Sequence, residues 1–131
     1  MELGITRGGS KQDLLDKKYR IAVGISLGNK WFTPANIVEA TKWSLAHTKD
    51  LVIVYVADTI HAINLEVRNR ISSEKALRIA KEKGEALLQE VKAELKEVES
   101  NDDFNRIHFT TWDGLLTESY REKVSFLYTL Y

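Results

Sequence analysis

Residues 19–29 read YRIAVGISLGN, an apolar and β-branched run that stops at a Leu-Gly-Asn turn. This pattern predicts a short buried strand with Ser26 at its carboxyl end. Thr33 and Pro34 come next, and they suit the N-cap and the first position of a helix. A second run, LVIVYVA at 51–57, is apolar throughout, as expected of a strand that is covered on both faces.

The rest of the chain alternates between helices and a third strand. The predicted helices cover residues 33–47, 60–70, 73–99 and 117–131, residues 100–103 break the long helix, and the third strand covers residues 106–111. This alternation predicts an α/β fold with a Rossmann-like, doubly wound parallel sheet. We expect one domain over residues 19–131, preceded by an irregular arm over residues 1–18. In such sheets ligands bind beyond the carboxyl ends of the strands.

Composition excludes several classes of site. The chain has 131 residues, no cysteine, and 19 basic residues against 19 acidic ones. Disulfide frameworks, thiolate metal sites and cysteine nucleophiles are therefore excluded, as is a broadly basic nucleic-acid coat. The three histidines lack metal-ligand spacing, so no metal is expected. No apolar run approaches a membrane span and no secretory leader is visible, which predicts a cytoplasmic protein that does not contact membranes.

The stretch between Gly24 and Asn29 is the most informative part of the sequence. It lacks the third glycine of a dinucleotide fingerprint and the Gly-Lys-Ser/Thr of a P-loop. What remains is Ser26 at the end of a buried strand, two residues after a glycine that lets a ligand approach the backbone. An ordinary turn with Ser26 bonded to backbone is the alternative interpretation.

Other candidate residues also have two interpretations. Val54 and Val56 share one face of their strand, where they either wall a pocket or pack in the core. Asp58 either orients an amine or ribose or caps the next helix. His61 lies beside the expected cleft or on the surface.

The long helix carries basic residues that favour phosphate binding. Acidic residues lie among them and instead favour a solvated face of mixed charge. The basic set is Lys75, Arg78, Lys81 and Lys83, and the acidic set is Glu74, Glu82 and Glu85.

Residues 21–32, IAVGISLGNKWF, resemble the strand-and-loop signature of the tRNA-dependent cyclodipeptide synthases. The apolar strand, the Gly-x-Ser-x-x-Asn spacing and the following aromatic residue all match. The resemblance continues through WSLAHTKD, LVIVYVAD and INLEVRNR, and covers residues 17–131. It implies a Rossmann-like fold similar to the catalytic domain of class I aminoacyl-tRNA synthetases. It also implies that two aminoacyl-tRNAs are joined into a cyclic dipeptide without a cofactor, in keeping with the absence of both synthetase ATP motifs.

The resemblance implies a role for each matching residue. Ser26 would receive the first aminoacyl group as an ester, and Asn29 would help to place the ligand. Gly24 would leave space at the first amino-acid pocket, with Val54 and Val56 lining the pockets. The tRNA would be held by the helix that carries Arg78, Lys81 and Lys83.

The resemblance also bears on length. The catalytic tyrosines and glutamate of the family lie in a C-terminal half, so we expect residues 19–131 to be an incomplete domain. The apolar helix at 117–131 would then promote association. Two other interpretations stay open: a small Rossmann-like nucleotide-binding module similar to universal stress proteins, and a partner-binding domain without catalysis.

Overall fold

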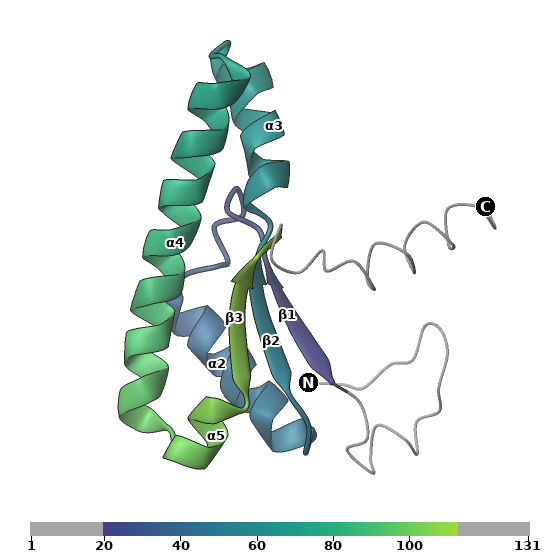
Figure 1. The fold of residues 1–131 in the computed structure, drawn as a ribbon, viewed down its shortest axis with the longest axis vertical. Coiled ribbons are helices and arrows are strands. Elements are labelled where there is room, and N and C mark those ends of the chain that lie inside the picture. Colours follow the sequence, from purple (N-terminus) through teal and green to yellow (C-terminus); the bar gives the residue numbers. More distant parts are fainter. Residues whose placement is uncertain (1–19, 113–131) are drawn as a thin grey trace, which may run out of the picture.

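The computed structural model describes residues 20–112, which form a three-stranded parallel sheet and four helices (Figure 1). The elements are β1 (Ile21–Ile25), α2 (Pro34–His47), β2 (Val52–Val56), α3 (Asp58–Asn69), α4 (Ser73–Val98), α5 (Asn101–Asn105) and β3 (Ile107–Thr111). The predicted α/β class with a parallel sheet is confirmed. The arm and the last helix that the sequence predicts fall at 1–18 and 117–131, outside the described residues.

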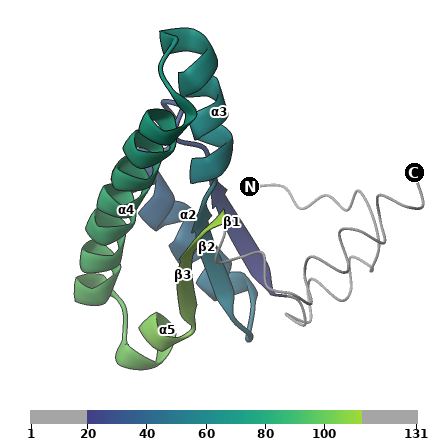
Figure 2. The same ribbon diagram turned by 45° about the horizontal axis from the view of Figure 1, so that its top comes forward.

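The sheet has the order β1-β2-β3, and its two faces differ in what covers them. In register, Val23 pairs with Val54 and Ile25 with Val56, so these side chains point to the same face. Val52, Val54 and Val56 have no exposed surface, and they belong to the main hydrophobic core. Helices α2 and α4 pack against this face and against each other. Among the described residues, the opposite face carries no helix (Figure 2).

Helix α3 and the first half of α4 extend beyond the carboxyl ends of the strands (Figure 1). Small residues allow these helices to pack closely, since Ala62 of α3 is buried with Ala76 and Ala80 of α4. Farther along α4, Gly84 lies against β2, where a Cβ atom would come within 3.0 Å of Val56 Cγ1. The close approach of α4 to β2 thus fixes where α3 stands above the edge of the sheet.

Local capping follows the sequence closely. The Oγ1 atom of Thr33 accepts from the Asn36 amide at 3.2 Å, and the Oγ atom of Ser72 accepts from the Lys75 amide at the same distance. The predicted break of the long helix is confirmed, because α4 ends at Val98. Ser100 then accepts from the Asp103 amide as the N-cap of a separate short helix, α5, which the sequence did not predict. The last strand begins at Ile107, one residue later than expected.

Arg106 is the C-cap of α5 and keeps helical backbone angles, so the strand begins after it. Its guanidinium donates to the carbonyl oxygens of Leu45 (2.9 Å), Thr48 (2.8 Å) and Asp50 (3.2 Å), and to Asp103 Oδ1 (3.2 Å). These bonds satisfy carbonyl groups at the C-terminus of α2 that the helix leaves without partners. Arg106 therefore ties α2, the turn before β2 and the start of β3 together.

Candidate functional site

The loop after β1 presents Ser26 at the carboxyl edge of the sheet. Ser26 is exposed, and its carbonyl oxygen accepts from the Asn29 amide at 3.2 Å. Asn29 Oδ1 in turn accepts from the Trp31 amide at 2.9 Å. These bonds hold the loop that carries Ser26, and no hydrogen bond within residues 20–112 uses the Ser26 hydroxyl.

A cavity of about 240 Å³ opens beside this loop. It joins the loop to one face of α3 and is called the serine cavity below. Its lining residues are Ser26, Gly28, Asn29, His61, Asn64, Leu65 and Arg68. The α3 residues recur at intervals of three and four, which places them on one stripe of the helix. The cavity is therefore formed by two segments that lie about 40 residues apart in the sequence.

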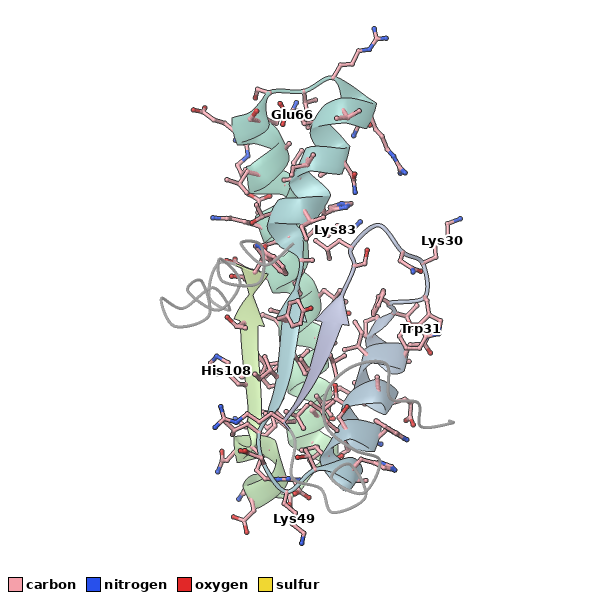
Figure 3. All side chains as sticks on the ribbon, turned by 90° about the vertical axis from the view of Figure 1, so that its right-hand side faces the viewer. Lys30, Trp31, Lys49, Glu66, Lys83 and His108 are labelled. Carbon is pink, nitrogen blue, oxygen red and sulfur yellow. The ribbon has the colours of Figure 1, made fainter. Side chains whose placement is uncertain are left out.

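Positive charge surrounds the imidazole of His61. Burial lowers the pKa of His61 below its ordinary value, and the cations of Lys83 and Arg68 lower it further. His61 is accordingly a neutral base at pH 7, able to accept a proton. Lys83 Nζ donates to the carbonyl oxygen of Leu27 at 3.4 Å, and Figure 3 places Lys83 beside the loop. The cavity thus combines a hydroxyl, a neutral imidazole and cations that attract anionic groups.

The residues predicted for an amino-acid pocket do not come together. Gly24 lies on the open face of the sheet, where a Cβ atom would be 2.7 Å from the hydroxyl oxygen of Tyr55. Val54 and Val56 point to the opposite face and are fully buried in the core. Because side chains alternate along a strand, Gly24 and the two valines face different sides of the sheet, and their part in amino-acid pockets stays a prediction. The Tyr55 ring occupies the space that the missing side chain of Gly24 leaves.

The three basic residues of α4 also separate. Arg78, Lys81 and Lys83 are all exposed. At 3.6 residues per turn, Lys83 is rotated by about 140° from Arg78 and by about 160° from Lys81. Lys83 faces the serine cavity through its bond to Leu27, whereas Arg78 and Lys81 lie on the outer side. Their binding of tRNA stays a prediction.

Asp58 is the first residue of α3 and is 1% exposed. Its Oδ1 atom accepts from the Thr59 amide at 2.9 Å. The N-cap of α3 is Ala57, and α3 has no side-chain cap hydrogen bond, so Asp58 does not cap the helix as the capping interpretation expected. Asp58 does not line the serine cavity.

The sequence pattern does not link Asn64, Leu65 and Arg68 to the serine cavity, and it leaves a surface position open as one interpretation of His61. The signal that would have found them is the spacing His61, Asn64, Arg68, which puts three polar side chains on one stripe of a helix directly after a strand.

No group of metal-ligating residues occurs within residues 20–112, and no helix there is long and apolar enough to cross a membrane.

Three solved structures share this fold. A Mycobacterium tuberculosis protein, described as showing that cyclodipeptide synthetases are related to type I tRNA synthetases, matches with a TM-score of 0.68 and 21% identity over 90% of this chain and 52% of its own. AlbC, a cyclodipeptide synthase from Streptomyces noursei, matches with a TM-score of 0.62 and 25% identity, over 79% of this chain and 47% of its own. A cyclo(L-leucyl-L-phenylalanyl) synthase matches with a TM-score of 0.67 and 23% identity, over 86% of this chain and 49% of its own.

These matches concern three-dimensional structure. No protein-family model and no curated protein sequence matches the chain. The chain spans about half the length of the structures named above. The resemblance expected from residues 21–32 is therefore confirmed at the level of the fold.

Proposed function

We propose that this chain supplies the serine-bearing half of a tRNA-dependent cyclodipeptide synthase. The observation that carries the proposal is the position of Ser26, exposed in a cavity at the carboxyl end of β1. In open α/β sheets this is where ligands bind. The fold around that position is shared with solved cyclodipeptide synthases.

In the proposed first step, Ser26 Oγ attacks the carbonyl carbon of an aminoacyl-tRNA. The bond between that carbon and the ribose oxygen breaks, the ribose oxygen takes a proton, and an ester with Ser26 forms. The step is a transesterification. The carboxyl group is already activated as the tRNA ester, so no ATP is needed. Neutral His61 lies in the same cavity and is a suitable acceptor for the serine proton.

In the second step, the α-amino group of another aminoacyl-tRNA attacks the Ser26 ester. A peptide bond forms, and the Ser26 hydroxyl is regenerated. The free amino group of the dipeptide then attacks the remaining tRNA ester, which closes the ring and releases the second tRNA. A covalent intermediate thereby divides one difficult transfer into easier steps.

Charge around the serine cavity supports a substrate rich in phosphate. Arg68 lines the cavity and Lys83 reaches the adjoining loop. Arg78 and Lys81 form a separate basic surface on the outer side of α4, where they would contact the tRNA backbone. Each phosphate contact to single-stranded RNA contributes about 0.7 to the slope of log affinity against log salt. Replacing Arg78 and Lys81 together should therefore flatten that slope.

The test is transfer of label from radioactive aminoacyl-tRNA to protein, trapped in acid. We expect label on the wild-type chain and none on Ser26→Ala. Ser73→Ala is the matched control, because Ser73 is also exposed but lies at the start of α4. Equal labelling of Ser26→Ala and wild type would refute the role of Ser26. Absence of label from the wild type, with strong thermal stabilisation by ATP, would favour a nucleotide-binding module.

A further inference from the structure

A second cavity, of about 260 Å³, lies on the other side of the loop after β1. It is called the tryptophan cavity, and it is lined by Trp31, Asn36, Glu39, Ala40 and Trp43. The last four recur at intervals of three and four on α2, so they form one stripe of that helix. The small side chain of Ala40 leaves space between the larger side chains on either side of it. The volume is just below the range of drug-sized ligand pockets and suits a single small ring system.

Trp31 is exposed over 53% of its surface, yet its backbone is firmly held. Asn29 Oδ1 accepts from its amide, and its carbonyl oxygen accepts from Asn36 Nδ2 at 2.6 Å and from the Thr33 amide at 2.8 Å. The indole also meets the ring of Phe32 edge-on, with centroids 5.1 Å apart. Figure 3 shows Trp31 beside the start of α2. A large apolar ring that is both exposed and fixed is suited to binding a flat partner.

The residues of the cavity carry acceptors, the side-chain oxygens of Asn36 and Glu39, and also donors, the two indole N–H groups and the second side-chain N–H of Asn36. The side-chain nitrogen of Asn36 is used by Trp31, and no hydrogen bond within the described residues uses its side-chain oxygen. The carboxylate of Glu39 is 76% exposed, with Lys42 Nζ at 3.9 Å from Oε1. A ligand that brings donors can use the oxygens of both Asn36 and Glu39. Because Lys42 offsets part of the charge of Glu39, a flat neutral donor fits better than a cation.

We propose that the tryptophan cavity binds one unpaired nucleobase that carries an exocyclic amino group. Aromatic side chains are the usual stacking platforms for unpaired bases, and a carboxylate accepts from the amino group of cytosine. The inference rests on the proposed function. Asn29 lines the serine cavity and Trp31 the tryptophan cavity, and two residues of extended chain span at most about 7 Å. The base would thus belong to the single-stranded, acylated end of tRNA.

The experiment measures binding of short unacylated RNA to the 131-residue chain. One tetranucleotide contains only adenosine and cytidine, and the other contains only uridine, which lacks an exocyclic amino group. We expect the first to bind more tightly, and Trp31→Ala to weaken its binding by roughly tenfold or more. Trp31→Phe keeps a stacking ring and should restore most of the affinity. Val67→Ala is the control, because Val67 is exposed on α3 and lines neither cavity.

Several results would overturn the proposal. Equal affinity for the two tetranucleotides would exclude recognition of the amino group. Unchanged binding by Trp31→Ala, with cooperative unfolding intact, would exclude stacking on this ring. Competition by tetramethylammonium, together with complete loss of binding in Glu39→Gln, would indicate a cation site, because glutamine keeps an acceptor oxygen but not the charge.

Failure of this inference can be told apart from failure of the proposed function. The RNA is unacylated, so its binding does not depend on chemistry at Ser26. Label on Ser26 without any effect of Trp31→Ala would refute the base site alone. Binding that depends on Trp31, without label on Ser26, would refute acyl transfer and leave the base site supported.

Discussion

Two cavities flank the loop after β1, and they differ in chemistry and in how the chain builds them. The serine cavity carries Arg68 and the imidazole of His61, with the cation of Lys83 nearby. The tryptophan cavity has indole walls and a carboxylate. The first depends on contacts between β1, α3 and α4, whereas the second is formed by the loop and a single helix. A change in the first half of α4, which packs on α3, should therefore damage the serine cavity more than the tryptophan cavity, which no residue of α4 lines.

The largest effect is expected at Gly84. A side chain there meets Val56 and Asp58 at 3.0 and 3.6 Å from the Cβ position alone. Gly84→Leu should push α4 off β2 and cost about 3 kcal/mol of unfolding free energy, at the upper end for overpacked cores. Urea denaturation measures the loss. Ala86→Leu is the control, since Ala86 is exposed on the same helix. Equal stability of the two variants would contradict the close approach of α4 to the sheet.

A smaller loss is expected when α2 is released at its C-terminus. Arg106→Ala removes four hydrogen bonds and leaves carbonyl groups near the end of α2 without their donor. We expect a loss of about 2 kcal/mol, because bonds from a charged group are worth more than neutral ones. Arg20→Ala is the comparison, since its exposed pair with Asp50 contributes at most about 1 kcal/mol. If both variants lost the same stability, the capping role of Arg106 would be wrong.

The sequence predicts the bounds of the helices and strands better than it predicts which faces of the sheet are covered. Periodicity and capping residues placed β1, α2, β2 and α4 within two residues, because these signals are local. Whether a helix covers a given face of β2 depends on contacts with segments far away in the sequence. The all-apolar run at 51–57 predicted cover on both faces, but Ile53 and Tyr55 lie on a face that bears no helix within residues 20–112. Because β2 carries large apolar or aromatic side chains on both faces, the sequence does not distinguish a strand covered on both faces from one covered on a single face.

The site was predictable to the extent that it is local. Ser26 and Asn29 belong to one short segment, and both line the serine cavity as a strand end should. His61 and Arg68 reach the cavity only because α3 is held by α4 over the edge of the sheet. Gly24 was paired with Val54 and Val56 on resemblance, without the register that separates them by face. Residues brought together by tertiary contacts leave no spacing signal between the segments.

Asn29 offers a variant that should affect both cavities. Its side chain lines the serine cavity and holds the Trp31 amide at 2.9 Å. Asn29→Ala should lower affinity for the adenosine-cytidine RNA and slow labelling of Ser26, each by roughly fivefold, the equivalent of one neutral hydrogen bond. Asn29→Asp keeps the acceptor oxygen and should retain the RNA affinity more fully. A loss in only one of the two assays would mean that Asn29 does not link the two cavities.

The smallest effect concerns pH and is confined to the serine cavity. Burial first, then Lys83 and Arg68, lower the pKa of His61 from its ordinary 6.5. The unfolded chain therefore binds a proton at His61 more readily than the folded chain does. By linkage, this contribution to stability is fully present above pH 6.5 and is lost as the pH falls toward the lowered pKa. Unfolding at pH 7.5 and at pH 5.5 should show a larger loss for the wild type than for His61→Gln. RNA binding at the tryptophan cavity should not distinguish the two proteins. An NMR titration that places the pKa of His61 at or above 6.5 would contradict the cationic surroundings assigned to the serine cavity.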